Sequence, residues 1–217
     1  MSDARDQIFR AIVEALDRNR NLGGTLSSSE ARSSYADTTP PRPGWDIPMQ
    51  QRFLDKLDAA AASWEILESS EDITAAVHAY LQRQGLPAAV RVAEHPLLEA
   101  LRWPEDLTVT PGTAHQGLDV GLSVADAAMA ETGTLILCSG PESPTSLVFL
   151  PDHHLVVLPQ DRLMPYMEDV WGLLRERPDF PPRSVNYVTG PSRTADVEQT
   201  MQLGAHGPRS LHVLLVP

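Results

Sequence analysis

The sequence contains a single cysteine, Cys138, among 217 residues. One cysteine cannot form a disulfide within the chain, and it cannot supply the several thiolates that hold an iron-sulfur cluster. The chain also lacks a Gly-x-Gly-x-x-Gly nucleotide-binding loop. If this protein serves redox chemistry, we therefore expect another chain to carry the cluster.

Basic residues are also few. The chain has 17 Lys and Arg against 29 Asp and Glu, a formal charge of -12 and a pI near 4.9. This balance repels a phosphate backbone, and no run of Lys or Arg offsets it, so a nucleic-acid partner is not expected. A site for a small anion would have to be built locally, from oriented N–H groups and a well-placed arginine.

Long apolar runs are absent. No stretch approaches the roughly twenty apolar residues that cross a bilayer, so the sequence predicts no membrane span. The first residues, Met1-Ser2-Asp3-Ala4-Arg5-Asp6, carry acids where a signal peptide carries bases, and no apolar region follows them. We therefore expect a cytoplasmic protein.

The length and patterning that remain are typical of one α/β domain with a smaller attachment. Residues 3–16 have the apolar period of an amphipathic helix, and residues 19–48 are rich in Gly, Ser and Pro without a sustained period. A second amphipathic helix is predicted over 49–62. We expect an N-terminal helical arm and linker over 1–62 and an α/β domain over 63–217.

Strands and helices alternate through the rest of the chain, which predicts a mostly parallel sheet with helices on both faces. The segment 125–130 is predicted as a short turn or helix. Helices are expected at 71–84, 147–150, 164–174 and 194–203, and strands at 64–67, 88–93, 107–110, 117–124, 132–138, 154–158, from 185, and at 211–216.

One stretch, 185–198, combines a β-branched strand, a Gly190-Pro191 turn and a predicted helix start. The first N–H groups of a helix have no partners within it and carry partial positive charge, so they bind anions readily. With Ser192, Arg193 and Thr194 beside it, this turn is a candidate anion site. The alternative is that Ser192 or Thr194 only caps the helix.

Two segments resemble the signatures of a known family. Gly190-Pro191-Ser192-Arg193-Thr194-Ala195-Asp196-Val197-Glu198, followed by Gly204-Ala205-His206-Gly207-Pro208, resembles one signature of the LUD-domain family, and within it of the lactate utilization protein C branch. The segment 125–134 resembles the other signature, in the same order and spacing. The N-terminal third resembles the family only in its predicted helices and variable linker.

The resemblance implies a fold similar to that of sugar-phosphate isomerases and CoA transferases. It also implies a subunit of a three-protein system that oxidises L-lactate to pyruvate with iron-sulfur partner proteins. No cofactor is expected in this chain, and its own role would be to bind or regulate, with a small carboxylate or phosphate as ligand. A purely structural role as an assembly scaffold is a further alternative.

An enzymatic alternative rests on Glu131, because Ala130-Glu131-Thr132-Gly133 is similar to the Ser-Glu-Asn-Gly loop that carries a CoA transferase's nucleophilic glutamate. The chain would then be a stand-alone CoA-transferase-like or isomerase-like enzyme using Glu131 as catalyst. The other reading is a structural or ligand-orienting carboxylate. We also expect Glu131 and the 192–194 turn to share one pocket at the sheet edge.

Three further polar residues in the 125–134 segment are candidate ligand contacts. Thr132 and Thr134 lie two apart on a predicted strand, so both could donate to one bound oxyanion, although threonine is also a common strand residue. Asp126 either contacts the ligand or stabilises a turn.

His206 lies between two small residues and belongs to the resemblance. Beside Arg193 it suits a 2-hydroxy or 2-oxo carboxylate, since arginine binds the carboxylate in bidentate fashion and histidine bonds the second oxygen. The alternative is that His206 only caps carbonyl groups. His153 and His154 are neighbours on a predicted strand and point to opposite faces, so no metal site is predicted.

Overall fold

The structure is a computed structural model that describes residues 42–114, 119–140, 143–195, 201–203 and 207–217. Its contacts divide the chain into Met1–Gly44 and Trp45–Pro217. The predicted helix at 3–16, most of the predicted linker, and His206 lie outside the described residues. The compact unit thus begins at Trp45, earlier than the expected boundary after Ala62, because helix α3 (Met49–Ala59) buries Phe53, Leu54 and Leu57 in the core.

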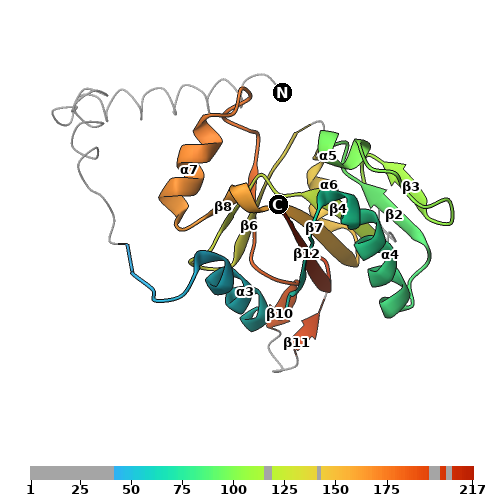
Figure 1. Cartoon of the computed structure of the whole chain (residues 1–217), viewed down its shortest axis with the longest axis horizontal. Helices are drawn as coiled ribbons and strands as arrows, with labels where there is room; N and C mark the ends of the chain where they lie inside the picture. Colours follow the sequence, from blue (N-terminus) through green and yellow to red (C-terminus); the bar gives the residue numbers. More distant parts are fainter. Residues whose placement is uncertain (1–41, 115–118, 141–142, 196–200, 204–206) are drawn as a thin grey trace, which may run out of the picture. The chain divides into compact units, whose positions relative to one another are not determined.

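A six-stranded sheet organises this unit, and every neighbouring pair in it is parallel (Figure 1). Its central strands are almost wholly buried, mostly apolar and free of Asp, Glu, Lys and Arg, as expected of parallel strands that are covered on both faces. The predicted mostly parallel fold is confirmed. In spatial order the strands are β1 (Ser63–Ile66), β12 (Ser210–Val216), β7 (His153–Pro159), β4 (Val120–Val124), β2 (Ala89–Val92) and β3 (Thr108–Pro111).

Helix α4 (Ile73–Gln84) packs on one face of this sheet. Its buried residues Val77 and Leu81 join a cluster with Val157 of β7 and Leu214 of β12. The helix ends at Gly85, whose φ of 65° is the left-handed conformation that glycine adopts without steric cost. The predicted helix at 71–84 is therefore confirmed, and it connects two parallel strands as a βαβ crossover.

A second, four-stranded sheet lies on the other face, with α3 packed against both sheets. Its strands β5 and β6 are antiparallel, as are β6 and β9, whereas β5 and β8 are parallel. The predicted turn or helix at 125–130 is wrong, because residues 127–129 pair as a strand. Local helix propensity is weak against the burial of both faces of this segment. The order is β8 (Leu163–Met164), β5 (Ala127–Met129), β6 (Thr134–Cys138) and β9 (Val185–Val188).

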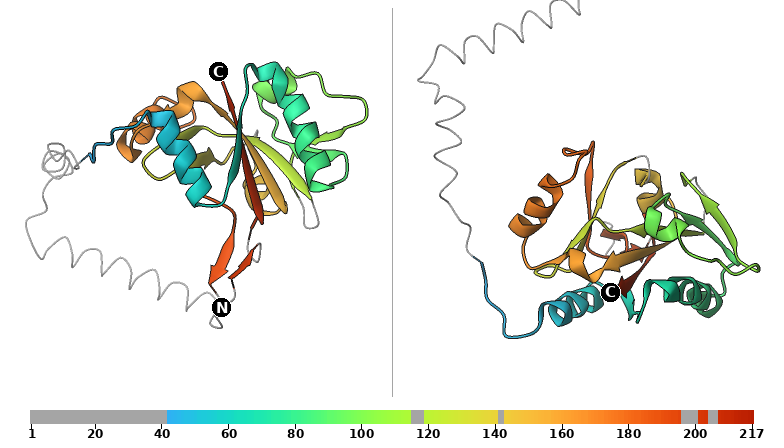
Figure 2. Two further views of the ribbon diagram at one scale, coloured as in Figure 1. Left: turned by 60° about the horizontal axis from the view of Figure 1, so that its bottom comes forward. Right: turned by 45° about the horizontal axis from the view of Figure 1, so that its top comes forward.

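Three further helices complete the layers. Helix α7 (Met167–Arg175) covers the outer face of the smaller sheet, where Val170 and Leu174 pack against Ile136 and Cys138. The short helices α5 (Pro96–Glu99) and α6 (Thr145–Phe149) follow β2 and precede β7. The two sheets are thus enclosed between α4 on one side and α7 on the other (Figures 1 and 2).

The segment after β9 departs from the prediction. Residues 193–195 form β10 (Arg193–Ala195), which pairs antiparallel with β11 (Met201–Leu203) in a hairpin that Figure 2 shows projecting from the sheets. The predicted helix over 194–203 is wrong. Its start was inferred from a turn and capping residues, and here cross-strand bonds satisfy the backbone instead. The turn at Gly190 therefore leads to no helix N-terminus, so the expected source of positive charge is absent.

Candidate functional site: a pocket at the carboxyl ends of three parallel strands

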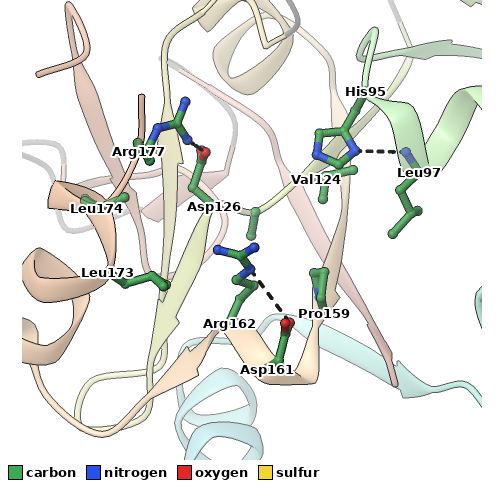
Figure 3. A pocket seen from close by; sticks show the side chains of 11 residues that line it. His95, Leu97, Val124, Asp126, Pro159, Asp161, Arg162, Leu173, Leu174 and Arg177 are labelled. Atoms are coloured by element: carbon green, nitrogen blue, oxygen red, sulfur yellow. Dashed lines mark hydrogen bonds and ion pairs between the residues drawn. The ribbon is translucent and has the colours of Figure 1, made fainter. Parts of the chain in front are cut away.

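A pocket of about 400 Å³ lies where three neighbouring parallel strands end. The chain leaves β2 toward His95, β4 toward Asp126 and β7 toward Arg162, and α7 closes one side (Figure 3). We call it the strand-end pocket. In open α/β sheets ligands bind in the crevice beyond the carboxyl ends of the strands. Its lining comprises His95, Leu97, Val124, Ala125, Asp126, Pro159, Asp161, Arg162, Leu173, Leu174 and Arg177.

Arg162 supplies positive charge to this pocket. A short 3₁₀ turn, Gln160–Arg162, begins directly after Pro159 at the end of β7 and places Arg162 at the pocket wall. Figure 3 shows its guanidinium pointing into the pocket. Its Nε lies 3.7 Å from Oδ1 of Asp161, an ion pair beyond hydrogen-bond length, and both side chains are substantially exposed. The planar donor fork of Arg162 is thus available for a carboxylate.

Asp126 is held by the protein itself. Its Oδ2 accepts a hydrogen bond of 2.7 Å from the backbone N–H of Cys138, and its Oδ1 pairs with the guanidinium of Arg177. Arg177 also donates to both carboxylate oxygens of Asp179, at 2.9 and 3.0 Å, and this arginine lowers the pKa of Asp179. Asp126 therefore ties the start of β5 to the end of β6 and to the segment after α7.

His95 stands on the opposite wall from Arg177 (Figure 3). Its Nδ1 accepts a hydrogen bond of 3.2 Å from the N–H of Leu97, in the first turn of α5. A neutral ring that accepts at Nδ1 carries its proton on Nε2, which is then a donor. The pocket therefore combines a cationic fork on one side with an imidazole ring on another.

A second lobe of about 470 Å³ shares His95, Asp126 and Arg177 with the strand-end pocket and reaches Cys138. Cys138 is 2% exposed, as the buried strand predicted. Burial raises the pKa of its thiol to about 11, and the negative charge of Asp179 adds a smaller contribution in the same direction. The thiol is therefore protonated near neutral pH and is a poor nucleophile.

The residues of the 190–194 turn lie elsewhere. Gly190 and Ser192 line a separate cavity of about 210 Å³ between the two sheets, which we call the interlayer cavity. Arg193 is exposed, and its NH2 group donates to the carbonyl oxygen of Ala60 at 2.8 Å. Only the backbone of Thr194 is described, as part of β10.

The hydroxyl groups of Thr132 and Thr134 bond each other at 2.6 Å, and Thr134 bonds Thr189 at 2.9 Å. These consecutive hydroxyl hydrogen bonds link the β5–β6 turn to the end of β9. Glu131 lies in the same turn, where its N–H donates to the carbonyl of Pro165. Glu131 lines neither the strand-end pocket nor the interlayer cavity, so the geometry does not gather Glu131 and Ser192 in one of these pockets.

Within the part of the chain that the structure describes, no group of three or more His, Cys, Asp or Glu is placed to hold a metal ion. The described helices are also all too short or too polar to cross a membrane. Sequence reasoning missed Arg162, Arg177 and His95. A signal was available for Arg162, because it follows within four residues of the predicted strand at 154–158.

The fold and the strand-end pocket define a class. The sequence model of the LUD domain matches residues 113–216, which include β4, β7 and the turn that carries Arg162. The crystal structure of a DUF162 family protein from Deinococcus radiodurans is similar in fold, with a TM-score of 0.60 and 19% identity over 78% of this chain and 96% of that one. The chain thus has the architecture of a LUD-domain protein.

Sequence relatives show which family within this class the chain belongs to. Lactate utilization protein C of Geobacillus kaustophilus is 30% identical over 98% of this chain and 95% of its own length. The protein of the same name from Geobacillus thermodenitrificans is 25% identical over the same shares, and that from Bacillus subtilis is 31% identical over 45% of this chain and 42% of its own. The chain belongs to the lactate utilization protein C family, as the resemblance in the sequence predicted.

Proposed function

We propose that this chain is a small-carboxylate-binding subunit of an L-lactate utilization system, which oxidises L-lactate to pyruvate together with iron-sulfur partner proteins. Family membership supports the lactate system. The observation that carries the ligand class is the guanidinium of Arg162, which points into the strand-end pocket where the parallel strands end.

The chemistry of the pocket suits a 2-hydroxy or 2-oxo carboxylate. Arg162 binds the carboxylate through two parallel N–H bonds, and the ligand replaces the weak pairing with Asp161. His95 bounds the space beside the carboxylate, where the hydroxyl or keto oxygen would lie. Arg177 is already paired with the carboxylates of Asp126 and Asp179, so its role is to hold the pocket wall in place.

The role of the chain in this proposal is binding. With a single cysteine it does not supply the thiolates of a cluster, so the electrons released from lactate pass to clusters on the partner subunits. The pocket would then present or sense the substrate or product. We place the assembly in the cytoplasm.

Calorimetric titration of the purified full chain with L-lactate, pyruvate and inorganic phosphate tests the ligand class. We expect saturable binding of lactate or pyruvate, weakened in Arg162→Lys, because an ammonium keeps the charge and loses the planar fork. Absence of carboxylate binding in the wild type, or equal affinity in Arg162→Lys, contradicts this assignment.

Two further measurements separate the remaining parts of the proposal. Anaerobic co-purification with untagged candidate iron-sulfur proteins should recover a complex, and recovery of the chain alone contradicts the partner assignment. Incubation with CoA thioesters and a carboxylate acceptor should show no exchange. Exchange that is lost in Glu131→Gln would establish the acyl-transfer alternative instead.

A further inference from the structure

The interlayer cavity lies at the opposite end of β7 from the strand-end pocket. His154, near the start of β7, lines the interlayer cavity, whereas Pro159 at its end lines the strand-end pocket. The two residues are five steps apart along the strand, a distance of ~16 Å. Leu211 of β12 and Val188 of β9 form its walls from the two sheets. The two pockets are therefore distinct sites.

His154 is the polar centre of the interlayer cavity. The residue is 1% exposed, and its Nε2 lies 2.6 Å from the hydroxyl oxygen of Ser123. Its Nδ1 is buried and has no hydrogen-bond partner among the described residues. A buried ring nitrogen without a partner is costly, so His154 is the residue of the cavity lining whose hydrogen-bonding capacity is unmet.

The surroundings of His154 favour an uncharged partner. Burial lowers the pKa of this histidine to about 4, so the ring is neutral near pH 7. None of the described residues that line the cavity is Asp, Glu, Lys or Arg. Val148, Leu211 and Val188 supply apolar walls, and Ser192 adds a hydroxyl group. An anion bound against His154 would therefore find no counter-charge among these residues.

We propose that the interlayer cavity binds a small uncharged molecule with an apolar body and one hydroxyl group, which hydrogen-bonds to Nδ1 of His154. A hydroxyl both donates and accepts, so it meets Nδ1 in either tautomer of the ring. The cavity, at about 210 Å³, is larger than a 150 Å³ apolar cavity that admits benzene. The body therefore has the size of a phenol or a short branched alcohol.

Phenol, benzene and benzoate probe this site in the full chain. Phenol should bind roughly three- to tenfold more tightly than benzene, which matches one neutral hydrogen bond. Benzoate should not compete with phenol for the cavity. Equal binding of phenol and benzene overturns the role of the hydrogen bond, and no phenol binding overturns the proposal as a whole.

The double variant Ser123→Ala/His154→Leu removes both members of the buried hydrogen bond and keeps the apolar volume. It should lose the preference for phenol over benzene, and Arg162→Ala should retain it. A preference that persists in a folded double variant contradicts the role of His154.

Nuclear magnetic resonance of the His154 ring nitrogens in the wild type keeps the test decisive if the double variant does not fold. The Nδ1 resonance should move on addition of phenol and stay unchanged with benzoate. A His154 resonance that phenol leaves unchanged overturns the proposal, whatever the outcome of the carboxylate titrations.

Discussion

Replacement of Asp126 distinguishes a residue that holds the fold together from one that holds a ligand. In Asp126→Ala the backbone N–H of Cys138 loses its 2.7 Å acceptor, and a buried donor without a partner costs about 1–3 kcal/mol. The ion pair with Arg177 is also lost. Its side chains are only 17% and 28% exposed, but Arg177 keeps its bonds to Asp179, so this loss adds about 1 kcal/mol.

We therefore expect Asp126→Ala to lower the free energy of unfolding by about 2–4 kcal/mol. Asp126→Asn keeps an acceptor for Cys138 and loses only the charge, so it should cost about 1 kcal/mol. Asp179→Ala is the matched control, because it removes the other carboxylate of Arg177 at an exposed position, and its effect on the free energy of unfolding should be the smallest of the three.

Urea unfolding with linear extrapolation measures these differences, and titration with pyruvate measures the site. Because Asp126→Ala removes a negative charge from the pocket wall, carboxylate affinity should be unchanged or higher. A variant of wild-type stability, within about 0.5 kcal/mol, that no longer binds pyruvate would refute the reasoning and make Asp126 a ligand contact.

Three other outcomes follow from local geometry. Gly133→Ala should cost at least about 2 kcal/mol in urea unfolding, since its φ is 73° and an added Cβ would lie 2.5 Å from the Cβ of Lys56; an unchanged midpoint contradicts this. A bulky thiol reagent should label Cys138 slowly at neutral pH, because its pKa is about 11, and rapid labelling argues against the buried strand. Burial lowers the pKa values of His154 and His212 to about 4, so the unfolded chain takes up protons first as the pH falls. The contribution of the two histidines to the free energy of unfolding should be complete above pH 6.5 and should fall between pH 6.5 and 4, by about 1.4 kcal/mol per histidine and pH unit. A free energy of unfolding that does not change over this range refutes the prediction.

Much of the fold was predictable because its central strands are buried on both faces. The largely apolar runs that become β6, β7 and β12 contain no Asp, Glu, Lys or Arg, and the periodic face of α4 with its terminal Gly85 is equally clear. Burial of this kind leaves a direct trace in sequence. The segment 127–129 was not predicted correctly, because alanines favour a helix, whereas this segment pairs with a strand on each side.

The candidate site was harder to predict because it depends on which strand ends meet. Arg162 and His95 are 67 residues apart in sequence and belong to one pocket only because β7 and β2 both flank β4. The turn after Gly190 had the residues of a helix cap, but no sequence pattern revealed that β11 would pair with β10. Patterns in a single sequence predict local structure, whereas the order of the strands in the sheet decides which residues meet in a pocket.

The most direct test compares two arginines. Each of Arg162→Ala and Arg193→Ala removes one exposed guanidinium, so each should leave the melting temperature nearly unchanged. Calorimetric titration with pyruvate should then show a loss of affinity on the order of tenfold or more for Arg162→Ala, which matches one charge-assisted pair, and wild-type affinity for Arg193→Ala. The reverse result, with binding kept in Arg162→Ala and lost in Arg193→Ala, would contradict the strand-end pocket and place the anion at the Gly190 turn.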